Sequence, residues 1–226
     1  MSGLPAFDPR LIPVSSTDQH LPQVHSEHLH GQALRQRFAN PPAWSPEFHS
    51  DARSIQRSPV PAAVLVPLVM RQEPMVLLTE RTTRMSSHSG QVAFPGGKAD
   101  ADDADVEATA LREAEEEIGL NSRFVEIIGN LPIYTTVTAF EVTPVVALVE
   151  PGFVVTPNPI EVASVFEVPL AFLMNPANHR RHVVHWQGER REWLSMPYQD
   201  ADDERFIWGA TAAMLRNLYS FLRVPL

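Results

Sequence analysis

The chemistry that this sequence supports is clearest at three glutamates near its middle, Glu113, Glu116 and Glu117. In an α-helix, their i, i+3 and i+4 spacing places all three carboxylates on one face within a single turn. Like charges at this spacing destabilise an isolated helix, so a counterion is expected to offset their repulsion. Mg²⁺ and Mn²⁺ prefer oxygen ligands, and Mg²⁺ is usually held by carboxylates together with substrate phosphates. The sequence therefore predicts a site for a divalent cation on this helix.

The alternative is an ordinary solvated helix face, which is what an acidic run usually forms. Three neighbouring features favour the metal site. Gly119 ends the helix directly after the acids, and Arg112 stands four residues before Glu116, where it pairs with that side chain and orients it. An apolar stripe on the opposite side would fix the helix against a core, and it consists of Leu111, Ala114 and Ile118.

The run from Arg112 to Gly119 resembles the end of the Nudix box, Arg-Glu-x-x-Glu-Glu-x-Gly. This box is the loop-helix-loop signature of hydrolases that act on nucleoside diphosphates linked to another moiety. The preceding segment, Leu77 to Asp100, resembles the extended motif of the coenzyme A pyrophosphatase branch of that family. The matching positions are Ser87-His88-x-Gly90-Gln91-Val92 and Phe94-Pro95-Gly96-Gly97.

This resemblance implies an α+β fold, the Nudix α/β/α sandwich with a mixed sheet, over roughly residues 60 to 224. It also implies an enzyme that uses Mg²⁺ or Mn²⁺, with Glu113, Glu116 and Glu117 as the metal ligands. Glu116 and Arg112 are further expected to act in catalysis, although the resemblance does not say which carboxylate serves as a base. The expected substrate is a small nucleotide of the coenzyme A type, and a homodimer is plausible by resemblance alone.

One part of the box departs from the general pattern. Eight residues before Arg112, where the general box has a glutamate, this chain has Ala104, with Asp103 and Asp105 on either side. The glycine expected fourteen residues before the arginine is replaced by Lys98, and Gly97 lies one residue earlier. The loop is therefore one residue longer, and the identity of the first acidic position stays open.

Glycines and donors before the helix would complete a site for phosphates. Gly96 and Gly97 permit close approach of the backbone to a metal or a phosphate. Lys98 either contacts phosphate or is simply solvated. Arginine suits phosphate dianions because its N–H donors form a fork. The hydrogen-bonding side chains before the glycines are therefore expected to bind substrate, including the 3′-phosphate of coenzyme A. These residues are Arg81, Arg84, His88 and Gln91. Without the motif, these arginines would be read as surface residues, and His88 as a structural hydrogen-bonding residue.

Glu161 lies in a loop that carries a catalytic acid in many Nudix enzymes. It is a candidate general base. The alternative is an exposed loop glutamate that precedes a strand.

Composition limits the kinds of binding partner and cofactor site that this protein is expected to have. The absence of cysteine excludes disulfides, thiolate metal sites and cysteine nucleophiles. A formal net charge of -9 without a basic patch disfavours binding to a nucleic-acid polymer. Neither a targeting signal nor a membrane-spanning apolar run is evident, so a cytoplasmic protein without a membrane partner is expected.

The chain divides into an N-terminal extension, residues 1–58, and a hydrolase domain, residues 59–226. The extension is rich in Pro, His, Ser and Gln, and a short helix is expected at residues 30–39. A metal site among its histidines is conceivable, but their spacing is irregular and no acidic or cysteine partner accompanies them. These histidines are His20, His25, His28 and His30.

The domain begins with short β-type runs. Strands are expected at residues 62–69, 75–79, 91–94, 124–131, 141–149 and 161–166, and a hairpin about Gly188 at residues 182–186 and 192–194. A helical turn is expected at residues 170–174. Apolar spacing predicts an amphipathic helix over residues 207–222.

Three functions are compatible with these patterns. The first is hydrolysis of coenzyme A or its derivatives to 4′-phosphopantetheine and adenosine 3′,5′-bisphosphate. The second keeps the chemistry but changes the substrate to ADP-ribose, a dinucleotide or a nucleoside triphosphate, because loops select what is attached to the pyrophosphate. The third is a non-catalytic module that binds a nucleotide, which the intact ligand positions disfavour and only Ala104 favours.

Overall fold

The computed structural model describes residues 8–50, 58–82, 90–186 and 188–225. Its helices are α1 (Gly31–Ala39), α2 (Val106–Ile118), α3 (Leu170–Leu173) and α4 (Gly209–Leu222), with four short 3₁₀ turns, η1 (Pro9–Leu11), η2 (Ser26–His28), η3 (Ser122–Phe124) and η4 (Pro176–Asn178). The strands are β1 (Val14–Thr17), β2 (Val60–Val69), β3 (Met75–Arg81), β4 (Val92–Ala93), β5 (Gly96–Lys98), β6 (Val125–Asn130), β7 (Tyr134–Thr135), β8 (Phe140–Val149), β9 (Val162–Pro169), β10 (Arg180–Trp186), β11 (Glu189–Asp200) and β12 (Asp203–Trp208).

The larger sheet has eight strands and is mixed, as expected. Its main order is β4-β3-β2-β8-β6, with β5 beside β2, β7 beside β8 and β9 beside β3. β2 and β8 run parallel along their whole length, from Val60 opposite Phe140 to Val69 opposite Val149. The other pairs are antiparallel, and β2 is joined to β3 by a short connection that places Val69 opposite Met75.

Both faces of this sheet are buried, which explains why β2 and β8 are nearly continuous apolar runs. Successive residues of β2 alternate between two separate cores, with Leu65 in one and Val66 in the other. α2 covers the first core with the predicted apolar stripe, of which Ala114 and Ile118 are fully buried. Because α2 is fixed on this side, its opposite face is free to carry the carboxylates.

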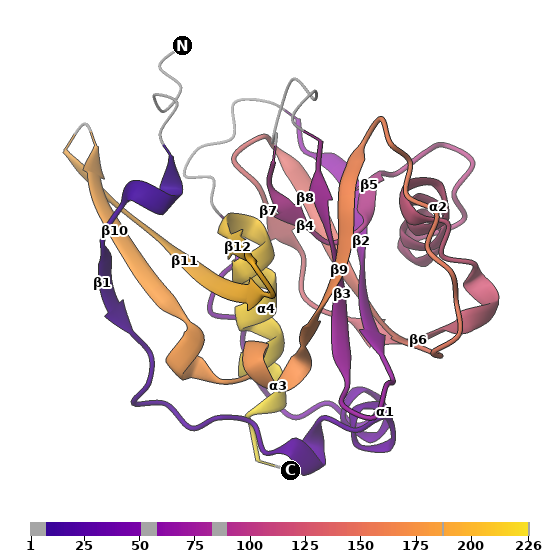
Figure 1. Ribbon diagram of the computed structural model, residues 1–226, viewed down its shortest axis with the longest axis horizontal. Helices are drawn as coiled ribbons and strands as arrows, with labels where there is room; N and C mark the ends of the chain where they lie inside the picture. The colour runs from indigo at the N-terminus through magenta and orange to yellow at the C-terminus, as the bar shows by residue number, and fades with distance from the viewer. Residues whose placement is uncertain (1–7, 51–57, 83–89, 187, 226) are drawn as a thin grey trace.

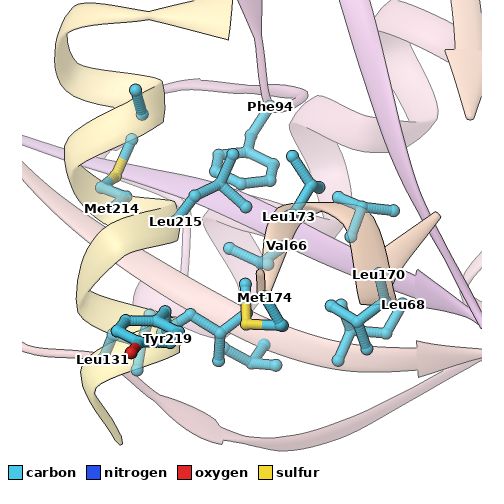
Figure 2. Close-up of a cluster of buried hydrophobic side chains, with 14 of the residues drawn as sticks. Val66, Leu68, Phe94, Leu131, Leu170, Leu173, Met174, Met214, Leu215 and Tyr219 are labelled. Carbon is cyan, nitrogen blue, oxygen red and sulfur yellow. The ribbon is translucent and has the colours of Figure 1, made fainter. Parts of the chain in front are cut away.

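The other core is closed by α4 and a second sheet (Figure 1). This sheet has four strands in the order β1-β10-β11-β12, and α4 lies between the two sheets. Every residue of α4 from Thr211 to Leu222 is buried, as is typical of a helix covered on all sides. Figure 2 shows Met214, Leu215 and Tyr219 of this helix packed with residues of β2, α3 and the loops.

The predicted hairpin about Gly188 is confirmed as β10 and β11, with Trp186 opposite Glu189. The predicted start of the final helix is wrong. α4 begins at Gly209, and Ile207 belongs to β12, where it is fully buried against the same core. The apolar spacing continues across the boundary because both elements face one core.

Residues 8–50 are more structured than their composition suggested. Leu34 of α1 is fully buried, and β1 adds an antiparallel strand to β10. Asp18 pairs with Arg181 and Arg216, both from the C-terminal half of the chain. This segment packs against the rest of the molecule, while a domain boundary at residue 58 stays a prediction. Within the described residues, none of the helices is long and apolar enough to cross a membrane.

Candidate active site

Helix α2 is fixed at both ends. At its start, the side chain of Asp105 accepts a hydrogen bond from the amide of Ala108 at 2.8 Å, the usual N-cap arrangement. At its end, Gly119 adopts a left-handed conformation with φ of 67°, and its amide bonds back to the last turn. The carboxylates of the last two turns therefore have a defined direction.

The three predicted metal ligands lie on this helix with different exposures. The side chain of Glu117 is 5% exposed, that of Glu113 16% and that of Glu116 59%. Glu117 accepts a hydrogen bond from the amide of Gly96 at 3.2 Å, and its other oxygen lies 3.6 Å from the guanidinium of Arg81. Glu117 is thus held at the centre of the site, whereas Glu116 lies at its edge.

Arg112 organises the outer part of this face. Its guanidinium donates two hydrogen bonds to Asp103, both of 2.9 Å. It also bonds to Glu113 at 3.0 Å, to Glu116 at 3.2 Å and to the carbonyl oxygen of Lys98 at 3.1 Å. The predicted pairing of Arg112 with Glu116 is present, but Asp103 is its principal partner.

Asp103 therefore supplies the acid that the sequence left open. It lies six residues after Gly97, and its side chain is only 8% exposed, whereas Ala104 is exposed. Bonds from Arg112 hold the pKa of Asp103 well below its usual range. The sequence alone does not distinguish Asp103 from Asp105, the acid on the other side of Ala104. The spacing of Asp103 from Gly97 is a signal that could have favoured it.

The glycine loop lies directly against the carboxylates. A Cβ atom added at Gly97 would lie 2.5 Å from an oxygen of Glu113, and one added at Gly96 would lie 2.4 Å from the carbonyl oxygen of Ala63. A larger residue at Gly96 would meet backbone atoms, whereas one at Gly97 would displace the carboxylate of Glu113. β5 pairs with β2 through these glycines, so the sheet itself brings this backbone to the acids.

Two further side chains enter the site from β3 and from the residue before β9. Arg81 ends β3, and Glu161 precedes Val162, the first residue of β9. The amide of Thr82 donates to the carbonyl oxygen of Glu161 at 2.9 Å, which ties the two strand ends together. The negative charge of Glu161 acts on both Glu113 and Glu117. Glu161 is thus close to the acids of α2.

Two carboxylates of this site, those of Glu117 and Glu113, have raised pKa values. Burial raises the pKa of Glu117 to about 7, and the charges of Glu161 and Glu113 act in the same direction. Burial likewise raises the pKa of Glu113, although Arg112 opposes the shift. A bound divalent cation would reverse this effect, because it favours the ionised form.

The donor set fits a hard cation in its chemistry, since it consists of carboxylates and backbone carbonyls beside a partly exposed face. Among the described residues, no three His, Asp or Glu side chains stand ready-arranged around a common metal position. Arg112 bonds to one oxygen each of Glu113 and Glu116. Each of these glutamates has a second carboxylate oxygen with which it could bind a metal alongside Glu117.

The remaining predicted residues are placed as follows. The carbonyl of Gln91 accepts a hydrogen bond from the amide of Arg81 at 3.0 Å, so Gln91 adjoins the site through its backbone. Lys98 is exposed, and its carbonyl rather than its amine contacts the site in the structure. Arg84 and His88 lie outside the described residues. The N-terminal histidines form no metal-binding group within the part of the chain that is described.

Comparison with known proteins identifies the family of this chain. Residues 59–205 match the model of the NUDIX domain family. The chain therefore belongs to the Nudix family, and the α+β fold expected from its box is confirmed. Nudix hydrolases cleave nucleoside diphosphate derivatives and generally use divalent metal ions such as Mg²⁺ or Mn²⁺.

Several relatives are closely similar in sequence. Over 158 residues, the chain is 44% identical to the uncharacterized Nudix hydrolase NudL of Citrobacter koseri and 43% identical to that of Escherichia coli O1:K1 / APEC. Each alignment covers 70% of this chain and 80% of the relative. Among solved structures, an Ap4A hydrolase of C. elegans is 20% identical with a TM-score of 0.41, over 48% of this chain and 80% of that one.

Proposed function

We propose that this protein is a metal-dependent pyrophosphohydrolase that cleaves coenzyme A or its derivatives to 4′-phosphopantetheine and adenosine 3′,5′-bisphosphate. The observation that carries the proposal is the contact between two motifs. Arg81 and Gly96 belong to the segment that resembles the coenzyme A pyrophosphatase branch, and both lie against Glu117 of the box helix. The substrate-type motif and the metal-type motif thus form one site.

The residues have separable tasks in this proposal. Glu113, Glu116 and Glu117 would hold Mg²⁺ or Mn²⁺, which when bound neutralises phosphoryl charge and makes a coordinated water more acidic. Arg112 positions Glu113 and Glu116, and Arg81 directs a cationic fork at anionic oxygens beside Glu117. Glu161, opposite these acids, is suited to accept a proton from the attacking water. The amides and carbonyls of Gly96 and Gly97 allow the substrate to approach closely.

Purified protein should be incubated with coenzyme A and either Mg²⁺ or Mn²⁺, and the products separated by chromatography. We expect equal amounts of 4′-phosphopantetheine and adenosine 3′,5′-bisphosphate, because one pyrophosphate bond is cleaved. Absence of adenosine 3′,5′-bisphosphate with both metals would refute the substrate assignment. A Glu117→Gln variant, which keeps the size of the side chain and removes its charge, is expected to be inactive.

A substrate panel tests the wider family alternative. If kcat/KM for ADP-ribose exceeds that for coenzyme A more than about tenfold, equivalent to about 1.4 kcal/mol of transition-state discrimination, the enzyme belongs to another substrate class. Dephospho-coenzyme A belongs in the same panel, because it differs from coenzyme A only in lacking the 3′-phosphate.

Variants of Arg81 and Arg84 test separately how the pyrophosphate and the 3′-phosphate of coenzyme A are recognised. Arg81 lies beside Glu117, so Arg81→Ala is expected to lower kcat/KM on coenzyme A and dephospho-coenzyme A alike, by about ten- to a hundredfold. Arg84→Ala is expected to lower it on coenzyme A alone if Arg84 binds the 3′-phosphate. Equal losses for the Arg84 variant on both substrates would remove that residue from the 3′-phosphate site. A cytoplasmic location and a homodimer remain predictions from the sequence.

A further inference from the structure

The strands that bring Arg81 and Glu161 to the site are irregular where they reach it. Along most of their length β3 and β9 pair in regular antiparallel register, from Met75 opposite Pro169 to Glu80 opposite Ser164. The next pair joins Arg81 with Val162, so one extra residue of β9, Ala163, lies between the two pairs. Such a β-bulge bends its strand and redirects the side chains around it.

A side chain from the second sheet meets this bulge. Arg205 of β12 donates hydrogen bonds to Glu80 at 2.8 Å and to Ser164 at 3.1 Å, the pair that immediately precedes the bulge. Ser164 also donates to the same oxygen of Glu80 at 3.3 Å. One guanidinium nitrogen therefore joins both strands at the last regular pair.

The guanidinium of Arg205 is itself held in place. It lies 4.5 Å from the ring centroid of Phe166 and bonds to Asp200 at 3.2 Å. Its side chain is 15% exposed, so water competes less for these bonds than at an open surface. A fixed group at this point limits how far the two strand ends can move.

The residues just beyond the bulge are those that the proposed function uses. Arg81 follows Glu80 directly, and Glu161 is bonded through its carbonyl to the amide of Thr82. A displacement of either strand end would therefore alter the position of Arg81 relative to Glu117 and of Glu161 relative to the acids of α2. Small displacements of groups that bind or activate the reactants reduce rates strongly.

We infer that Arg205 is a positioning residue for the reaction: by joining Glu80 to Ser164 it fixes the bulge that aims Arg81 and Glu161 at the carboxylate face of α2. This inference rests on the proposed function for its kinetic consequence and on the β3–β9 geometry for its structural one. The second sheet thereby contributes to the site without lining it.

The chain offers a matched control on the same strand. Arg71 donates two hydrogen bonds to the carboxylate of Glu167 on β9, one of them at 2.6 Å. This ion pair lies away from the bulge. Arg205→Ala and Arg71→Ala each remove one arginine that is bonded to this strand. We expect kcat to fall about tenfold or more in the Arg205 variant with a smaller change in KM, and to stay unchanged in the Arg71 variant.

Two conservative variants test the joint contact. Ser164→Ala removes one of the two strand partners of Arg205, so a smaller loss of kcat is expected than for Arg205→Ala. Arg205→Lys retains the charge but has a single amine to serve both strands, so partial recovery is expected. The inference would be overturned if Arg205→Ala had the kcat of the wild-type protein. It would also be overturned if kcat fell equally in Arg205→Ala and Arg71→Ala.

Hydrogen exchange of the Thr82 amide gives a readout that needs no activity. This amide donates to Glu161, so its exchange should accelerate in Arg205→Ala and not in Arg71→Ala when measured by NMR. Unchanged exchange in the Arg205 variant would overturn the inference even in an active enzyme. If the wild-type protein hydrolysed none of the substrates, the proposed function would fail, and the Thr82 exchange rate would still decide whether Arg205 fixes the strand ends.

Discussion

At the scale of single residues, Asp103 and Arg112 control how the acids proposed to bind a metal are presented. Arg112 donates two bonds to Asp103 but one each to Glu113 and Glu116. Asp103 therefore determines where the guanidinium lies, and the guanidinium determines where the two glutamates lie. A change at Asp103 should act on the reaction through Arg112.

Asp103→Ala is expected to lower kcat/KM about ten- to a hundredfold, because Arg112 loses two charge-assisted bonds and its fixed position. Asp102→Ala is the matched control, since Asp102 is a neighbouring but exposed acid whose removal should leave the rate unchanged. Steady-state kinetics on coenzyme A would measure both. Introducing Ala104→Glu into the Asp103 variant should not restore activity, because residue 104 faces solvent. Recovery there would show that the acid can act from either position.

The sequence was sufficient for part of this site and insufficient for the rest. Glu113, Glu116 and Glu117 were predictable because helical spacing alone places them on one face. Asp103 was not, because several acids surround Ala104 and only the folded loop shows which of them meets Arg112. The approach of Gly97 to Glu113 also depends on the pairing of β5 with β2, which local sequence does not specify.

At the scale of elements, the end of α2 is held by the loop that leads to Glu161. Within that loop, the amide of Thr156 donates to the carbonyl oxygen of Ile118, and the amide of Asn158 donates to the backbone carbonyl oxygen of Glu117. Gly119 makes this turn possible, since its φ is 67° and a Cβ there would lie 3.1 Å from Cβ of Thr156. One glycine thus fixes both the end of the helix and its contact with this loop.

Gly119→Ala should destabilise the fold by about 1 kcal/mol for the left-handed backbone, with a further loss from contact with Thr156. Gly188→Ala is a useful comparison, because φ there is 79° and no atom lies within 4 Å of the added Cβ. The free energy of unfolding should therefore fall more for Gly119→Ala, as measured by urea denaturation. Equal losses would mean that Thr156 moves aside without consequence.

Element types were largely readable from apolar periodicity, but element boundaries near the second sheet were not. Ile207 has the spacing of the following helix and the burial of a core residue, yet it belongs to β12. Its assignment depends on pairing with Met196 of β11, a contact between separate segments. Apolar periodicity indicates which side of an element is buried, but it does not identify the strand with which that element pairs.

At the scale of the whole molecule, a buried network of charges joins the two ends of the chain. Arg216 of α4 bonds to Asp18 at 3.0 Å, to Glu47 at 2.6 Å and to Nδ1 of His179 at 2.9 Å. The other ring nitrogen of His179 donates to the carbonyl oxygen of Leu173 at 2.7 Å, so the ring is neutral with its proton on Nε2. Burial lowers the pKa of His179 to about 4.

This network predicts a loss of stability in mild acid. Because the folded pKa of His179 lies below its value of 6.5 in the unfolded chain, the unfolded state takes up the proton first, and stability falls as the pH drops from 6.5 through 4. Between pH 7 and pH 5 this residue alone should lower the free energy of unfolding by about 2 kcal/mol. Urea denaturation at both pH values would measure it.

His179→Gln is the control for this pH dependence, because it keeps a donor and an acceptor but does not titrate. Its loss between pH 7 and pH 5 should be smaller than that of the wild-type protein by about the same amount. An identical pH dependence in the two proteins would contradict the assignment. At lower pH, Asp18 and Glu47 add to the loss: burial opposes their ionisation, but Arg181 and Arg216 more than offset it and leave both pKa values lowered.

The parallel pairing of β2 with β8 has a consequence for how the protein folds. Residues 60 and 140 are neighbours in the sheet, and the whole of α2 lies in the chain between them. Closing so long a loop is entropically unfavourable until the sheet forms, and a fold with this contact order is expected to assemble slowly. The glycine loop and Arg81 meet the acids of α2 only through that same sheet. The complete site should therefore arise late in folding, so that a cation bound by the proposed ligands would stabilise the folded chain and contribute little to its assembly.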